Sequence, residues 1–302
     1  MKHSMFFYLS RPKAYIRKLC VKLSESYALK EQWKHHMNYP LNLSNPQTLC
    51  EKLQWLKLYD RNPLYHQLVD KYEVKAIVDK KLGKGHTAEC YGVYNSVDEI
   101  HLDKLPNRFV LKCTHDSGSF AICKDKSTFD FKHAKEILQA GLNNTSYYNM
   151  FFEWAYKDVP PRIIAEEYID SLGKPESVEY KITCMNGKVK MITICSGIPH
   201  SDFDKRFNDH FTPEGKRLPF VAYYQPAGKE LPSAELKAEL IRLSEILAEN
   251  IPYVRVDWYV HEGKIFFGEM TFYTWAGYMD IQPKEYDSLL GSWLQLPQKR
   301  KE

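Results

Sequence analysis

Apolar residues recur at helical spacing in four stretches of the chain. Thr48, followed three residues later by Glu51, forms a capping-box pattern just before leucines at helical spacing, and this pattern predicts a helix over 48–59. Three further helices are predicted over 71–81 with a stop at Gly83, over 129–141 with a stop at Gly141, and over 233–250.

Alternation of polar and apolar residues, the signal of a half-buried strand, is clearest over 179–195. Asn186-Gly187 in its middle supplies the turn of a hairpin. Lys181 falls on the polar side of the first strand, and we expect it to face a cleft. Shorter apolar runs bounded by turn residues predict strands over 109–113, 120–124 and 162–169.

The stretch 197–232 has no sustained period and many turn residues, so it is predicted to be a long functional loop or lid. It contains the cluster Asp204-Lys205-Arg206 and His200, which could meet an acidic substrate. A solvated charged loop explains these residues equally well.

A second hairpin is predicted over 254–270, with Glu262-Gly263 as its turn. Asp257 and Glu269 lie near the middle of its two strands, where antiparallel pairing brings them side by side. Two facing carboxylates are usually neutralised by a cation, and oxygen ligands of this kind suit Mg²⁺. Arg255 shares a face with Asp257 and suggests phosphoryl or acyl-phosphate chemistry. The alternative is a surface hairpin whose charges point to water.

A short loop rich in small residues follows the predicted strand 109–113. Its Ser117-Gly118-Ser119 turn would let backbone N–H groups approach an anion, and Lys112 on the strand could add a point charge. The spacing of a Walker loop is absent, and an isolated glycine hairpin is the competing interpretation. Lys71, at the start of the predicted helix 71–81, could also reach a bound phosphate.

The predicted strand 162–169 carries adjacent carboxylates, Glu166 and Glu167, which therefore point to opposite faces. Such a strand could offer the backbone of Tyr168 and Ile169 to a purine edge while one glutamate takes a ribose hydroxyl. The alternative is an edge strand with a solvent-exposed glutamate.

Composition narrows the class of protein. At 302 residues and 44% hydrophobic content the chain can bury a sizeable core, which we expect to be divided between two coupled lobes. A net charge of +4 without a repeated basic and aromatic pattern argues against nucleic acid as a partner. Seven scattered cysteines fit a reducing cytoplasm, and we find neither a signal peptide nor an apolar run of about 18 residues.

The N-terminal stretch 1–36 is basic, with apolar residues interspersed, and is predicted to form an amphipathic helix or helix pair. Such a segment could rest on an anionic membrane at its cytoplasmic face. We favour the alternative of a helix packed on the body of the protein with its basic side solvated.

The order of these elements resembles the ATP-grasp superfamily, and most closely its TupA-like branch, found among bacterial surface-polysaccharide genes. The resemblance covers about 70–277 and is strongest in RVDWY and KIFFGEMTFY of the last hairpin. It implies an α+β fold in which two α+β lobes clamp ATP. A reduced, mainly helical region over 1–69 would precede an ATP-grasp domain over 70–302, with a small nucleotide lobe at about 105–165 and a larger C-terminal lobe at about 166–290.

The resemblance also implies roles for individual residues. The metal would be bound by Asp257 and Glu269, with Thr271 where the family commonly has asparagine, and Arg255 would steady the transferring phosphoryl group. Lys181 is the further catalytic candidate. The implied ATP contacts are Lys71, Lys112, Ser117, Gly118 and Ser119 at the phosphates and Glu166, Glu167, Tyr168 and Ile169 at the adenosine.

The leading hypothesis is an ATP- and Mg²⁺-dependent ligase that joins a carboxylate to an amine through an acyl phosphate. From the family's setting, the partners would be a uronic acid or amino sugar of a surface polysaccharide and an amino acid. One competing hypothesis is a glycosyltransferase, for which Asp202-Phe203-Asp204 resembles a DxD motif in its letters only. Another is a non-catalytic nucleotide-binding scaffold.

Overall fold

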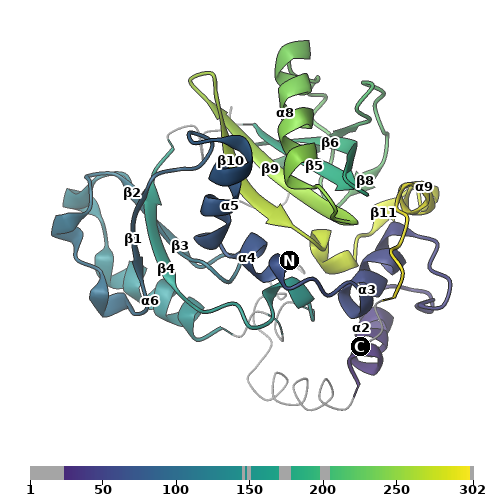
Figure 1. The fold of residues 1–302 in the computed structure, drawn as a ribbon, viewed down its shortest axis with the longest axis horizontal. Helices are drawn as coiled ribbons and strands as arrows, with labels where there is room; N and C mark the ends of the chain where they lie inside the picture. Colours follow the sequence, from purple (N-terminus) through teal and green to yellow (C-terminus); the bar gives the residue numbers. More distant parts are fainter. Residues whose placement is uncertain (1–23, 145–146, 148–150, 170–177, 198–204, 300–302) are drawn as a thin grey trace.

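Two antiparallel sheets, with helices packed around them, form the framework of the structure (Figure 1). The computed structural model describes residues 24–144, 147, 151–169, 178–197 and 205–299. Most of the basic N-terminal stretch and the whole of Asp202-Phe203-Asp204 therefore lie outside the described residues, as does His200. No helix in these ranges is long and apolar enough to cross a membrane.

The smaller sheet has four strands in the order β1-β4-β2-β3, and every neighbouring pair is antiparallel. Its core is formed by Phe109, Leu111 and Ile163, which pack with Leu138 of the helix that covers the sheet. The elements are β1 (Cys90–Tyr94), β2 (Phe109–Cys113), β3 (Phe120–Cys123), β4 (Ile163–Glu167) and α6 (Phe131–Leu142), with short 3-10 helices η2 (Val97–Glu99), η3 (Leu102–Lys104), η4 (Lys126–Thr128) and η5 (Trp154–Tyr156).

The larger sheet has five antiparallel strands in the order β10-β9-β5-β6-β7. Its apolar face packs against helix α8, where Ile182 and Val256 of the sheet and Leu243 of the helix are fully buried. The opposite face carries Lys181 and Asp257, which are cross-strand neighbours. The elements are β5 (Glu179–Met185), β6 (Lys188–Gly197), β7 (Arg206–Phe211), α8 (Ala234–Leu247), β9 (Tyr253–His261) and β10 (Lys264–Thr271).

Helices from the two ends of the chain pack beside the larger sheet. Helix α3 starts at the predicted capping box, in which Thr48 and Glu51 each accept a hydrogen bond from the other's backbone N–H. It lies against α9 so closely that a Cβ on Gly291 would be 2.1 Å from the main-chain oxygen of Gln47. The remaining helices are α2 (Glu25–His36), α3 (Leu49–Tyr59), α4 (Leu64–Val69), α5 (Glu73–Leu82), η7 (Thr274–Gly277) and α9 (Glu285–Trp293). A separate two-stranded sheet is formed by β8 (Val221–Ala222) and β11 (Ile281–Gln282).

The predicted hairpins are both confirmed, since Asn186-Gly187 and Glu262-Gly263 have the positive φ angles that two-residue hairpin turns require. The predicted loop over 197–232 is wrong in part, because it contains strands β7 and β8. Polar residues on both sides of β7, an edge strand, hid its period. Gly141 does not stop its helix; it lies inside α6, where a Cβ would be 2.5 Å from Ser119 Cβ.

Candidate active site

A network of buried charges lies on the polar face of the larger sheet. Asp257 on β9 is 1% exposed and accepts hydrogen bonds from Arg255 at 2.6 and 2.7 Å and from Lys181 at 2.5 Å. Burial alone would raise the pKa of Asp257, but the two cations outweigh it and hold the pKa below its ordinary value. Asp257 is therefore a carboxylate, and both of its oxygens have cationic partners.

Glu269 on the neighbouring strand β10 joins this network through Arg255. The Nη2 of Arg255, which binds Asp257, also lies 3.2 Å from Glu269 Oε1, and the Thr271 hydroxyl donates to the same oxygen at 3.4 Å. The pairing of β10 with β9 shifts between Phe267 and Met270, so Gly268 and Glu269 together lie opposite Asp257 at a β-bulge. We call Lys181, Arg255, Asp257 and Glu269 the β9 cluster.

The smaller sheet carries a second charged group, which we call the β2 cluster: Lys112 on β2, Glu166 on β4 and Lys75 on α5. Glu166 is buried and forms ion pairs with Lys75 at 2.9 Å and with Lys112. Burial alone would raise the pKa of Glu166, but the two lysines lower it below its ordinary value. Two cations thus surround one carboxylate, and the cluster carries a net positive charge.

The small-residue loop after β2 lies beside the β2 cluster and binds Lys71. The Lys71 ammonium donates to the main-chain oxygen of Cys113 at 3.1 Å and to that of Asp116. Ser117 and Gly118 are exposed, Gly118 with a φ of 102°, and Ser119 donates to Asp116 Oδ2 at 2.5 Å. The loop therefore presents its small residues to solvent, as a lid over phosphates requires.

Electrostatic coupling places the two clusters near one another. Burial lowers the pKa of Lys71, and both Lys112 of the β2 cluster and Glu269 of the β9 cluster act on it. Burial likewise raises the pKa of Tyr259 on β9, and carboxylates from both clusters add to the shift. Loop 83–89 ties the sheets together, since Phe267 N donates to the His86 oxygen at 2.6 Å.

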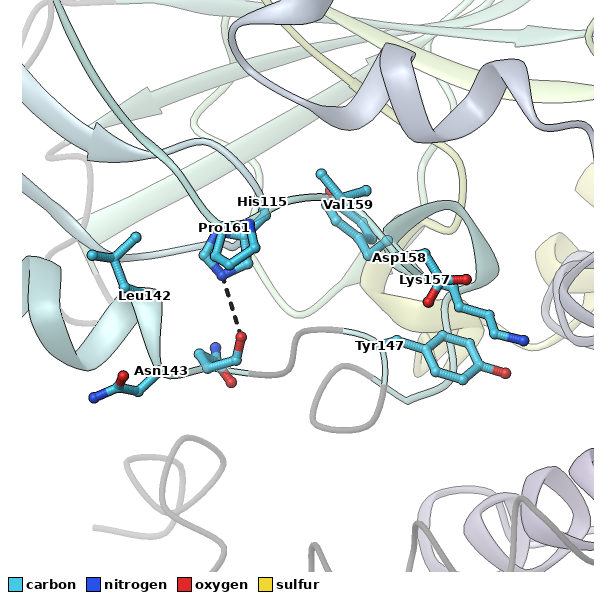
Figure 2. Close-up of a pocket in the computed structure, with 10 residues that line it drawn as sticks. His115, Leu142, Asn143, Tyr147, Lys157, Asp158, Val159 and Pro161 are labelled. Atoms are coloured by element: carbon cyan, nitrogen blue, oxygen red, sulfur yellow. Dashed lines mark hydrogen bonds between the residues drawn. The ribbon is translucent and has the colours of Figure 1, made fainter. Parts of the chain in front are cut away.

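A cavity of about 220 Å³ lies between the loop after β2 and the segment that leads into β4 (Figure 2). In Figure 2 His115 and Leu142 line one side and Tyr147 and Lys157 the other. Tyr156 also lines it, and burial raises the pKa of this phenol, with Glu269 adding to the shift. The cavity is smaller than one that holds a drug-sized ligand, and it is mainly apolar, so it suits a small molecule or part of a larger one.

The predicted adenosine residues follow the β2 cluster along the chain. Glu167 lies on the opposite face of β4 from Glu166, and its Oε2 accepts from the Glu89 N–H at 3.3 Å. Tyr168 and Ile169 are buried just beyond the strand, and the guanidinium of Arg108 lies 5.0 Å from the Tyr168 ring centre. Their contacts with a nucleotide stay a prediction.

Two residues of these networks, Lys75 and Glu179, were not predicted as site residues from the sequence. Lys75 lies one helical turn beyond Lys71, a spacing that could have suggested a second cation on the same face. Glu179 lies two residues before Lys181 on the same strand face, and it pairs with Lys181 at 3.2 Å and with Arg206 at 3.6 Å. The polar alternation over 179–195 contained this signal.

The oxygen atoms beside Arg255 fit a magnesium ion only in part. The Glu269 side chain is 45% exposed, and its Oε1 accepts from both Arg255 and the Thr271 hydroxyl, so one carboxylate and one hydroxyl oxygen lie together there. Mg²⁺ commonly takes one or two carboxylates and completes its shell with phosphate oxygens and water. Asp257 stays a predicted ligand whose oxygens Arg255 and Lys181 occupy. The described residues contain no group of three or more His, Cys, Asp or Glu that could hold a metal alone.

Comparison with known proteins gives one family and several solved structures. The TupA-like ATPgrasp family model matches residues 51–295. D-alanine–D-alanine ligase from Bacillus anthracis complexed with ATP is similar over 68% of this chain and 53% of its own, at 20% identity and a TM-score of 0.39. D-alanine–D-alanine ligase from Helicobacter pylori is similar over 78% of this chain and 60% of its own, at 16% identity and a TM-score of 0.40.

The ATP-grasp ligase PsnB, complexed with minimal precursor, Mg and ADP, is similar over 74% of this chain and 58% of its own, at 10% identity and a TM-score of 0.37. The chain thus spans between 53% and 60% of the length of these three proteins. No curated protein matches the sequence.

Proposed function

The chain belongs to the TupA-like ATP-grasp family, and from this premise we propose that it is an ATP-dependent carboxylate–amine ligase that releases ADP. The observation that carries the proposal is the position of Arg255. Its guanidinium bridges Asp257 and Glu269, the two acids expected to serve the metal, and both Glu269 and Lys112 of the β2 cluster act electrostatically on Lys71. The β2 cluster contributes a net positive charge and the β9 cluster contributes a positioned guanidinium, and both suit a bound triphosphate.

Arg255 has one nitrogen left for substrate. Its contacts with Asp257 and Glu269 use Nε and Nη2, and within the described residues Nη1 has no hydrogen-bond partner. Asp257 and Glu269 hold the guanidinium in place, and its side chain is 14% exposed. A fixed guanidinium with a free N–H pair is suited to a phosphoryl oxygen.

In the first step an oxygen of the substrate carboxylate attacks the γ-phosphorus of ATP, and the bond to the ADP oxygen breaks. The chain supplies positive charge rather than a nucleophile: Arg255 and Lys181 from the larger sheet, and Lys112 and Lys71 from the smaller lobe. The product is an acyl phosphate. Bound magnesium would offset further charge on the phosphate oxygens, and Glu269 and Thr271 would hold it.

In the second step an amine nitrogen attacks the acyl carbon, inorganic phosphate leaves and the nitrogen loses a proton, giving an amide. The mainly apolar cavity is lined by Tyr156, on which Glu269 and Arg255 act electrostatically, and its walls would limit the access of water to the acyl phosphate. Exclusion of water matters because an acyl phosphate is readily hydrolysed.

For the substrates we propose a uronic acid or amino sugar of a bacterial surface polysaccharide and an amino acid, following the setting of the family. The reaction consumes ATP, so we place it in the cytoplasm. Both assignments follow the setting of the family.

The test is to incubate the protein with Mg-ATP, uronic acids and amino acids, and to measure ADP and phosphate. Substitution of Arg255→Lys keeps the charge but removes the planar guanidinium with its several N–H donors. We expect kcat/KM to fall by about 10²- to 10³-fold. Arg242→Lys is the matched control, because Arg242 lies on the surface in an ion pair with Glu239, and its activity should equal that of the wild type.

Two results would overturn the ligase. Release of UDP from a UDP-sugar without consumption of ATP would indicate a glycosyltransferase. Tight binding of ATP without turnover across the substrate panel would indicate a non-catalytic scaffold.

A further inference from the structure

Three aromatic side chains, two of them exposed, gather near Lys181 of the β9 cluster. The rings of Tyr223 and Trp275 are 4.4 Å apart at 41°, and Tyr224 lies 5.8 Å from Trp275. Tyr223 and Trp275 are each 39% exposed, although most large apolar side chains of the described residues are buried. We call Tyr223, Tyr224 and Trp275 the aromatic platform.

The backbone under the platform is strained. Tyr223, Trp275 and Ala276 have φ angles of 68°, 51° and 51°, in the left-handed region that non-glycine residues rarely adopt. Backbone strain of this kind concentrates at functional sites. The turn holds Trp275 partly exposed beside Tyr223.

Helix α3 holds this turn in place from the buried side. Gln54 Nε2 donates to the main-chain oxygens of Ala276 at 2.9 Å and Gly277 at 3.0 Å, and the buried Lys57 ammonium donates to the Ala276 oxygen at 2.7 Å. The Tyr223 hydroxyl donates to the Tyr278 oxygen at 2.5 Å. The position of the platform is therefore set by tertiary contacts and is ready for a ligand before one binds.

A positive charge lies at the edge of the platform. The guanidinium of Arg206 is 5.4 Å from the Tyr224 ring centre, and the side chain is 21% exposed. Its acidic neighbour Glu179 is 3.6 Å away, beyond the usual hydrogen-bond distance, and Glu179 pairs more closely with Lys181. Arg206 can thus bind a second anion, such as a carboxylate.

The platform is continuous with the proposed active site. Thr274, which precedes Trp275, shares a hydrogen bond of 2.8 Å with the Tyr253 hydroxyl, and Tyr253 lies two residues before Arg255 on the same face of β9. From the other side, Arg206 leads through Glu179 to Lys181. A molecule on the platform could extend to the reacting groups.

We propose that the aromatic platform binds a sugar ring of the acceptor, and that Arg206 binds a carboxylate of the same glycan, so the acceptor is an acidic polysaccharide or oligosaccharide. Flat aromatic faces attract the partly positive C–H groups on one face of a sugar ring. A uronic acid has both features: its ring face would stack on the aromatic platform, and its carboxylate would pair with the Arg206 guanidinium. This inference rests on the proposed ligase function, because the bound glycan is an acceptor only if the protein is a ligase.

The test measures binding without ATP, by calorimetry with an oligogalacturonate. We expect Trp275→Ala to weaken binding about tenfold or more, by analogy with the loss of a ring-stacking contact. Tyr27→Ala is the control, because Tyr27 is also exposed but lies on α2, and binding should equal that of the wild type. The thermal midpoint of each variant checks that it folds, and Trp275→Phe, which keeps a flat ring, should retain most of the affinity.

The charge is tested with Arg206→Gln, which we expect to weaken binding of the oligogalacturonate. A neutral maltooligosaccharide of equal length should bind the wild type more weakly, and Arg206→Gln should leave that binding unchanged. Equal affinity for the two glycans would overturn the assignment to an acidic sugar.

Unchanged oligogalacturonate binding by folded Trp275→Ala, or no binding by the wild type, would overturn the platform. The two proposals can fail separately. Glycan binding that depends on Trp275 in a protein that consumes no ATP overturns the ligase alone. If the protein forms the amide and Trp275→Ala leaves the KM for the acceptor unchanged, the platform alone is overturned.

Discussion

Arg255 and Asp257, two residues apart on strand β9, form a two-pronged ion pair with distances of 2.6 and 2.7 Å. Residues at this spacing share one face of a strand, so the pair is built into a single element. The pairing explains how Asp257, 1% exposed, stays ionised in the interior. It also means that Arg255 is positioned before any substrate arrives.

Substitution of Asp257→Asn should destabilise the protein, because it leaves the buried charges of Arg255 and Lys181 without their main partner. We expect the free energy of unfolding to fall by about 3 kcal/mol in urea titrations. Glu239→Gln is the control, since Glu239 pairs with Arg242 on the surface and should change stability by less than about 1 kcal/mol. Equal effects of the two substitutions would contradict the buried network.

Substitution of Lys112→Gln should weaken binding of a non-hydrolysable ATP analogue with Mg²⁺. It removes one of two cations that surround Glu166, so the β2 cluster loses its net positive charge. We expect Kd to rise about 10- to 150-fold, the effect of losing a charge-assisted contact of about 1.5–3 kcal/mol. Lys188→Gln, at a surface pair with Glu245, should leave Kd unchanged in the same calorimetric titration, and a matching loss there would point to a non-specific charge effect.

Substitution of Gly291→Ala should separate helix α9 from the start of α3. The added methyl would lie 2.1 Å from the Gln47 main-chain oxygen, and backbone on both sides must then move. We expect a loss of about 1–3 kcal/mol in the free energy of unfolding. Ser292→Ala, at the next position and exposed, is the control for helix propensity. A stable Gly291→Ala protein would show that the two helices can separate at little cost.

Glu153 should make stability depend on pH. It is 5% exposed, and burial raises its pKa to about 8, with Glu269 adding to the shift while Lys57 and Arg255 oppose it. In the unfolded chain a glutamate has a pKa of about 4.3, so between these values the folded state holds a proton that the unfolded state has lost. Stability from this group is complete below about pH 4.3 and is lost as pH rises through about 8, at up to about 1.4 kcal/mol per pH unit.

Urea titrations at pH 5, 6 and 7 on the wild type and Glu153→Gln check this dependence. The stability of the wild type relative to the variant should decrease steadily across the series. Glu136→Gln removes a side chain that is 64% exposed and should show no such trend. A constant difference between the wild type and Glu153→Gln would mean that Glu153 is ionised in the folded protein.

Local pattern was enough to find most secondary structure. The capping box at Thr48 and Glu51 set the start of α3, and alternation with an Asn186-Gly187 turn predicted the hairpin of β5 and β6. It also indicated that Lys181 lies on a polar strand face. These features depend on residues close in the chain, whose spacing directly determines which side of an element they occupy.

Partners far apart in the chain were decided only by the tertiary structure. Lys181 meets Asp257 because β5 pairs with β9, and Lys75 meets Glu166 because α5 lies beside β4. The strained turn at Trp275 forms because Gln54 and Lys57, more than two hundred residues away, bind its oxygens. Periodicity states which face of an element is polar, but which faces meet depends on how all the apolar surfaces are buried together, and that is a property of the whole fold.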